Sequence, residues 1–192
     1  MGKTSETKAV AGVSDHSGWA VVVCIADDTV FDVRRIELIE PGLPNFAYHH
    51  AAQNLPIGEA VALVERVHAS AALCARSALS ELPTSVGVIA IRKRPKLPST
   101  VAERITNYWA QTRADSVRSR DVLAEAAKAR GWFVHEFDAK TVFAEAANVL
   151  GLDDISVRMK EIGELFGPPW NKDHKLATAA AVVAAKARQG DK

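Results

Sequence analysis

Cysteine is scarce in this chain, and neither sign of charge prevails. The two cysteines among 192 residues, Cys24 and Cys74, lie in apolar segments far from any C-x-x-C pair, which excludes a zinc cluster and a disulfide scaffold. The formal net charge of +1 identifies no partner, because a balanced chain has no strong long-range field. Apolar residues at 48% and charged residues at 24% exclude a disordered or collagen-like chain and are typical of a globular protein.

Long hydrophobic runs are missing as well. The longest apolar stretch, 176–185, is too short and too rich in alanine to span a bilayer. The first residues, MGKTSETK, are polar and lack the apolar centre of a signal peptide. The sequence has no internal repeat, and its length suits one domain. We therefore expect a cytoplasmic protein without a membrane partner, with a flexible N-terminus at 1–7 and one domain over 8–190.

Hydrophobic periodicity indicates the order of the elements. Short apolar or alternating runs, bounded by turn residues, predict strands over 8–14, 19–25, 29–40, 86–91 and 132–137. Apolar residues at three- and four-residue steps predict a helix over 57–82, and the capping box Thr100-x-x-Glu103 begins a helical region that runs to 130, with a break expected near 114–116. Three more helices are expected at 138–151, 153–166 and from 171 onward.

This order predicts an α/β fold. The first three strands form an antiparallel meander, and the later strands belong to β-α-β units, whose crossovers are right-handed. The expected result is a three-layer α/β/α domain around a mixed five-stranded sheet of order 3-2-1-4-5, with strand 2 antiparallel to the others.

Three carboxylates from distant segments are expected at one edge of this sheet. Asp15 follows the first strand, Glu59 lies in the first turn of the first long helix, and Asp173 lies in the first turn of the last helix. Clustered carboxylates repel one another unless a cation neutralises them. Hard divalent ions such as Mg²⁺ or Mn²⁺ prefer oxygen ligands, and a pair of them can activate water to attack a phosphodiester.

The same segments resemble the ribonuclease H-like superfamily, which includes ribonuclease H and the Holliday-junction resolvases. The likeness rests on the β-β-β-α-β-α-β plan and on three short motifs, GVSDHSGWAVVV, GEAVALVERV and WNKDHKLATAAA. The resemblance implies that Asp15, Glu59 and Asp173 are catalytic metal ligands in a divergent member of that superfamily.

One position departs from the pattern of that superfamily. Its members usually carry an acidic residue at the end of the fourth strand, where this sequence has Arg92. A guanidinium group cannot coordinate a metal. Either the metal site is reduced to the three carboxylates, or the fold has lost metal chemistry and Arg92 neutralises them or binds a substrate phosphate.

The segment that starts at Arg92 is basic. Residues 92–131 hold ten Lys or Arg against four Asp or Glu, which suits a nucleic-acid partner but equally suits a solvated helix face. Tyr108 and Trp109 could stack on bases or belong to the core, and His49-His50 could transfer protons or be a solvated pair. The candidate substrate-binding residues are Arg92, Lys93, Arg94, Arg104, Lys172 and His174.

Two functional hypotheses from different classes follow. The first is a metal-dependent nuclease that cleaves phosphodiesters, in which Asp15→Asn would abolish cleavage. The second is a non-catalytic nucleic-acid-binding or protein-interaction module of the same fold. A third hypothesis is an assembly partner or homo-oligomer, in which the alanine-rich last helix packs against another chain. The run Ser14-Asp15-His16-Ser17 contains the residue types of a serine-hydrolase triad, but no G-x-S-x-G elbow accompanies it.

Overall fold

A computed structural model describes residues 8–190. Within this range five strands form one mixed sheet of order β3-β2-β1-β4-β5. β2 is antiparallel to both β1 and β3, whereas β4 is parallel to β1 and to β5. The predicted order and directions are therefore confirmed, while the prediction for residues 1–7 lies outside the described range. The strands are β1 (Ala9–Asp15), β2 (Trp19–Ala26), β3 (Thr29–Glu37), β4 (Val86–Arg92) and β5 (Phe133–Phe137).

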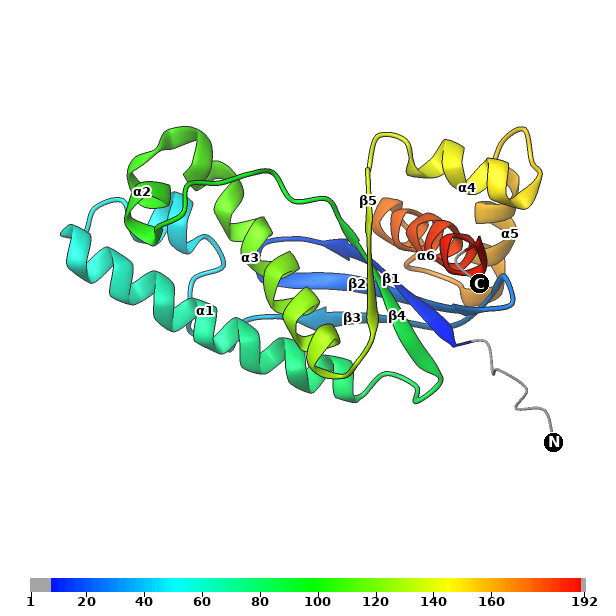
Figure 1. Cartoon of the computed structure of the whole chain (residues 1–192), viewed down its shortest axis with the longest axis horizontal. Helices are drawn as coiled ribbons and strands as arrows, with labels where there is room; N and C mark the ends of the chain where they lie inside the picture. The colour runs from blue at the N-terminus through cyan, green and yellow to red at the C-terminus, as the bar shows by residue number, and fades with distance from the viewer. Residues whose placement is uncertain (1–7, 191–192) are drawn as a thin grey trace.

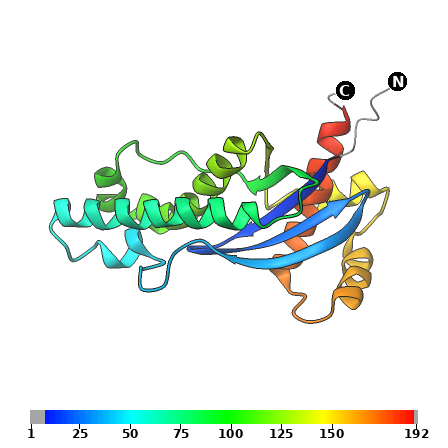
Figure 2. The same cartoon turned by 90° about the horizontal axis from the view of Figure 1, so that it is seen from below.

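Helices cover both faces of the sheet (Figures 1 and 2). One face carries α1 (Ile57–Ser80) and α3 (Tyr108–Ala129), and the other carries α4 (Val142–Leu150), α5 (Ser156–Phe166) and α6 (Lys172–Gly190). The loop between β3 and α1 contains a wide helical turn, η1 (Ala47–Ala51), and α2 (Val101–Thr106) precedes α3.

The break in the long helical region lies earlier than expected. It falls at Asn107 rather than at 114–116, because the Asn107 side chain accepts a hydrogen bond from the backbone N–H of Ala110 at 3.0 Å and caps a new helix. The capping box of Thr100 and Glu103 forms as predicted and begins the short α2.

β1 is buried on both faces, and alternation assigns each residue to one of them. Ala11 and Val13 belong to the core under α1 and α3. Val10 belongs to the core under α6, and Gly12 abuts the α6 backbone at Ala177. At the end of the strand, Ser14 therefore faces α6 and Asp15 faces α3.

The last helix is part of the core of this chain. Its alanines at 177, 179, 180, 181 and 184 are all completely buried, and the helix lies on β1, β2 and β4. The alanine-rich face is therefore used within the chain, which removes the reason to expect another chain on it. Within residues 8–190, none of the helices combines the length and the hydropathy needed to cross a membrane.

The close approach of α6 to β1 can be tested at Gly12. A Cβ atom added to Gly12 would collide with the backbone of Ala177, so we expect Gly12→Ala to destabilise the fold by about 3 kcal/mol. The measurement is chemical denaturation. Gly58→Ala is the matched control, because its Cβ would meet nothing within 4 Å, and wild-type or slightly higher stability is expected. Equal midpoints for Gly12→Ala and wild type would contradict the described packing.

Candidate functional site

Asp15 ends β1 between two arginines. Its carboxylate Oδ2 lies 2.7 Å from Nε of Arg120, which comes from the middle of α3. Its Oδ1 lies 3.7 Å from Nε of Arg92, the last residue of β4. The Asp15 side chain is only 1% exposed, so both guanidinium groups act on it without much screening by water. Two cations therefore flank one carboxylate.

A pocket of about 390 Å³ opens over these groups. Arg120 is nearly buried and also donates from Nη1 to the backbone oxygen of Lys93 at 3.3 Å, so it ties β1 to the end of β4. The Arg92 side chain is 31% exposed, and its Nε has no hydrogen-bond partner among the described residues. We call this cavity the arginine pocket, lined by Asp15, His16, Trp19, Phe46, Arg92, Thr112 and Arg120 among others. Its excess of guanidinium over carboxylate suits an anionic ligand.

Asp173 lies beside the same strand but on the opposite face. Its Oδ1 accepts a hydrogen bond from Oγ of Ser14 and pairs with Nε2 of His16, both at 2.8 Å. Burial raises the pKa of Asp173, but the hydrogen bonds from His16 and Ser14 outweigh burial and hold this pKa below its usual value. The His16 ring stacks on Trp19 with centroids 4.0 Å apart. Asp173 therefore fixes a histidine rather than facing Asp15.

This cluster is not a serine-hydrolase triad. In such a triad the serine hydroxyl bonds to the histidine, which takes its proton. Here the Ser14 hydroxyl donates to Asp173, and Ser14 is completely buried. Ser14 is thus a structural donor to the carboxylate.

Glu59 is not brought to the other two carboxylates. It is exposed in the first turn of α1, and the N-terminal end of that helix lies at the tip of the molecule, away from the end of β1 (Figures 1 and 2). Within the described range, no group of three or more His, Cys, Asp or Glu side chains is arranged to hold a metal ion. The donors of Asp15, Glu59 and Asp173 therefore do not fit the expected Mg²⁺ or Mn²⁺ site.

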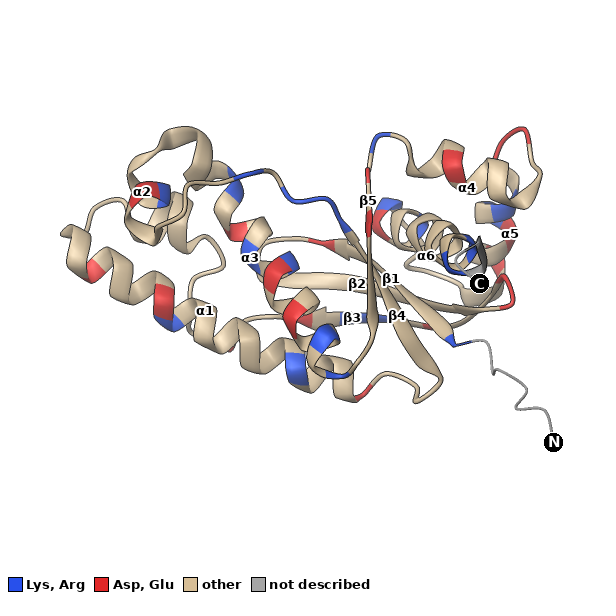
Figure 3. Ribbon diagram, in the orientation of Figure 1, with Lys and Arg blue, Asp and Glu red and all other residues tan. Residues whose placement is uncertain are grey.

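The predicted basic residues separate into several environments. Lys93 is exposed next to Arg92 on the basic loop that follows β4 (Figure 3). Arg94 is neutralised by Asp121 at 2.9 Å and by Glu136 at 2.7 Å. Arg104 donates from Nε to the backbone oxygen of Pro98 at 2.7 Å. Neither Arg94 nor Arg104 lines the arginine pocket.

The last two predicted contacts lie at the start of α6. Lys172 is exposed as the first residue of that helix. His174 is buried, and burial lowers its pKa. His174 lies in a second pocket, on the α6 side of the sheet.

The hypothesis of a solvated helix face fails for part of α3. Arg118 is 3% exposed and pairs with Asp115 at 2.9 Å. Asp115 also accepts backbone hydrogen bonds from Tyr48 and His49, each at 3.1 Å. Burial raises the pKa of Asp115 and lowers that of Arg118. This buried pair holds η1, and with it the neighbouring Phe46, at the mouth of the arginine pocket.

Exposed aromatic residues flank the pocket along α3. Tyr108 is 75% exposed and Trp109 is 46% exposed, so neither belongs to the core. The guanidinium of Arg113 lies 4.6 Å from the Trp109 ring centroid. Thr112, one turn further along the helix, lines the arginine pocket. Exposed aromatic rings and a residue of the cationic pocket therefore lie on one helix.

Sequence reasoning undervalued three residues of this site. Arg120 was one of several helix arginines, and its burial depends on the tertiary partner Asp15. His16 and Trp19 lie in a turn and at a strand start, where nothing local shows that they stack on each other. Only α3 carries a pattern in the sequence that could have indicated buried arginines. Its arginines are interspersed with small residues around the helix and do not form a separate charged face.

Comparison with solved structures identifies the fold. A structure of RuvC from Thermus thermophilus in complex with a Holliday junction substrate has a TM-score of 0.53 at 16% sequence identity, covering 95% of this chain and 96% of that chain. Another structure of Thermus thermophilus RuvC has a TM-score of 0.52 at 15% identity with the same coverage. No family model and no curated protein matches the sequence. At this identity the likeness shows a ribonuclease H-like fold, as predicted.

Proposed function

We propose that this chain is a ribonuclease H-like protein that binds nucleic acid and holds a backbone phosphate in its arginine pocket, without metal-dependent cleavage at Asp15. The observation that carries the proposal is the pairing of Asp15 with Arg120 at 2.7 Å and with Arg92 at 3.7 Å. Two guanidinium groups beside the carboxylate supply the positive charge that a divalent ion would supply in a nuclease, and guanidinium is a preferred partner of phosphate.

The surroundings of the pocket support a nucleic-acid ligand. The basic loop after β4 runs past α3 (Figure 3), and the exposed Tyr108 and Trp109 lie in the first turn of that helix. The RuvC chain of similar fold was solved with a Holliday junction substrate. A phosphate on arginines and bases on aromatic rings is a combination used by proteins that bind single strands.

The donor geometry favours this proposal over the metal-dependent nuclease. A divalent ion needs several oxygen donors directed at one point. Asp15 is paired with arginines on the α3 face of β1, whereas Asp173 is engaged by Ser14 and His16 on the α6 face. Arg92 is the side chain that would meet a ligand, and Arg120 is the one that orients Asp15.

Binding should depend on Arg92 and not on a divalent ion. We expect a fluorescently labelled single strand to bind wild type equally in EDTA and in Mg²⁺, with affinity that falls as salt rises. Arg92→Glu should weaken binding at least about tenfold, because it replaces a charge-assisted hydrogen bond by repulsion. The measurement is fluorescence anisotropy at several salt concentrations.

Arg158→Glu is the control, since the Arg158 side chain is 40% exposed on α5 and, among the described residues, forms an ion pair with Glu161 alone. It should bind within about twofold of wild type, as expected for a peripheral charge. Binding that requires Mg²⁺, or cleaved products in Mn²⁺ that disappear in Asp15→Asn, would instead establish the metal-dependent nuclease. Absence of binding at low salt would overturn both hypotheses.

A further inference from the structure

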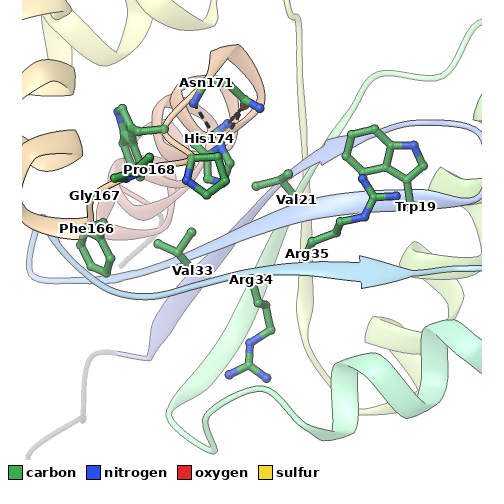
Figure 4. Close-up of a pocket in the computed structure, with 12 residues that line it drawn as sticks. Trp19, Val21, Val33, Arg34, Arg35, Phe166, Gly167, Pro168, Asn171 and His174 are labelled. Atoms are coloured by element: carbon green, nitrogen blue, oxygen red, sulfur yellow. Dashed lines mark hydrogen bonds between the residues drawn. The ribbon is translucent and has the colours of Figure 1, made fainter.

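A second pocket lies on the other side of Trp19. It has a volume of about 430 Å³ and opens between the β2–β3 edge of the sheet and the segment 166–174 (Figure 4). This volume is within the range of small-molecule sites, roughly 300–1,000 Å³. We call it the aromatic pocket, and the residues that matter are Trp19, Val21, Val33, Arg35, Trp170 and His174.

The aromatic pocket has an apolar floor and flat walls. Val21 and Val33 form the floor, on neighbouring strands (Figure 4). At one end the Arg35 guanidinium lies 3.9 Å from the Trp19 ring centroid, while it also pairs with Glu37 at 2.7 Å. At the other end, the rings of Trp170 and His174 have centroids 5.5 Å apart. Such surfaces match a planar heterocycle rather than a flexible chain.

The Trp170 end is rigid before any ligand arrives. The Trp170 indole donates from Nε1 to the backbone oxygen of Met159 at 2.8 Å. A side chain on Gly163 would collide with the same indole, so the ring is packed directly on α5. A wall that is already ordered loses little entropy when a ligand binds.

His174 supplies a polar atom inside this apolar setting. The residue is 8% exposed, and its Nδ1 lies 2.9 Å from Oδ1 of Asn171. Asn171 therefore engages one ring nitrogen of His174, and both residues line the pocket (Figure 4). His174 lines the aromatic pocket, so its imidazole offers a polar edge that could hydrogen-bond a heterocycle. A small number of fixed polar groups in a largely apolar pocket is typical of a binding site.

The two pockets share a wall. Trp19 lines the arginine pocket as well as the aromatic pocket, and its ring stacks on His16. A ligand that spans this wall would have an anionic part on Arg92 and a flat ring beside the stacked Arg35 and Trp19. A nucleotide has both parts, joined by a sugar.

We propose that an unpaired nucleobase of the bound strand enters the aromatic pocket while its phosphate lies in the arginine pocket. This inference rests on the proposed function and adds the form of nucleic acid that is recognised. A base can enter a pocket of this kind only after it leaves the stack, which costs a few kcal/mol in a duplex, so unpaired positions should bind more tightly than fully paired duplexes.

The experiment uses single strands with one 2-aminopurine, which fluoresces less when it stacks on aromatic rings. We expect wild type to quench this emission at an unpaired position and not within a duplex. Val33→Trp fills the floor of the aromatic pocket, so it should bind the strand about tenfold more weakly and lose most of the quenching. Trp170→Leu, which removes one wall, is the second variant, and thermal melting checks that both variants are folded.

Val157→Trp is the matched control, because Val157 is 67% exposed on α5 and lines neither of these two pockets. It should quench and bind like wild type. Unchanged affinity and quenching in both Val33→Trp and Trp170→Leu would overturn the base pocket while the proposed function stands. Absence of any binding to wild type would overturn the proposed function itself. Tighter binding of deoxyadenosine monophosphate than of the strand, lost again in Val33→Trp, would overturn a strand as the ligand.

Discussion

Asp15→Ala is expected to lower the free energy of unfolding by about 3–5 kcal/mol, because removing one partner of a buried ion pair leaves the other charge without compensation. Arg120 is 7% exposed, and its Nε lies 2.7 Å from the Asp15 carboxylate. Arg92 would lose its neighbouring anion as well. The measurement is equilibrium unfolding in urea at neutral pH.

This result separates the two roles that Asp15 could have. Metal ligands repel one another in the absence of the ion, so removing a carboxylate from a metal site leaves the metal-free fold as stable as before or more stable. A structural counter-ion behaves in the opposite way. An Asp15→Ala protein with the wild-type unfolding midpoint would therefore contradict the arginine pairing.

Two further variants make the test specific. Asp121→Ala removes a partner of Arg94 from a pair whose side chains are 29% and 34% exposed, and we expect a loss of no more than about 1 kcal/mol. The double variant Asp15→Leu with Arg120→Met replaces the buried pair by apolar groups of similar size. It should recover much of the stability, since such replacements are often neutral.

Ser14→Asp is expected to create a dependence on divalent ions that the wild type lacks. Ser14 is completely buried on the α6 face, with its hydroxyl 2.8 Å from Oδ1 of Asp173. A carboxylate at this position would face Asp173, and in EDTA the two negative charges should destabilise the fold strongly. Mn²⁺ should then restore stability, by about 2.7 kcal/mol at a concentration one hundred times the dissociation constant.

Thermal melting with and without Mn²⁺ is the measurement, and calorimetry gives the affinity. Ser14→Asn is the control, because it has nearly the same size but no charge to attract the ion. The wild type should melt at the same temperature in EDTA and in Mn²⁺. Stabilisation of the wild type by Mn²⁺, abolished in Asp15→Asn, would show instead that Asp15 is a metal ligand.

Hydrophobic pattern and turn chemistry were enough to predict the order of the strands and helices. The alternation and apolar runs of the strands, together with the handedness of crossovers, led to the sheet order that the structure has. The helix boundaries were less certain within 100–130, where Asn107 competes as a cap with the continuing helical pattern. The cap prevailed because its side chain satisfies a free backbone N–H of the new helix.

The hydrophobic pattern did not place Glu59 correctly relative to the end of β1. The loop after β3 and the start of α1 follow the edge of the sheet that carries Asp15, so a contact was a fair expectation. α1 has 24 residues and β1 has 7, which correspond to lengths of about 36 Å and about 23 Å. A helix that returns to the start of β4 must therefore extend well beyond the rim. The lengths of α1 and β1 can be estimated from the sequence, but the direction in which the N-terminal end of α1 extends beyond the sheet depends on packing.

The pattern of residues alone predicts the sheet order, the residues that end β1, and Arg92 where the superfamily that the chain resembles usually has an acidic residue. It could not determine which face of β1 each of these residues occupies. The strand is apolar on both faces, so alternation shows which residues share a face but not which helix covers that face. The packing of α6 against Gly12 and of α3 beside Asp15 decided it. Asp15 is thereby paired with arginines on the α3 face, whereas Asp173 is paired with Ser14 and His16 on the α6 face.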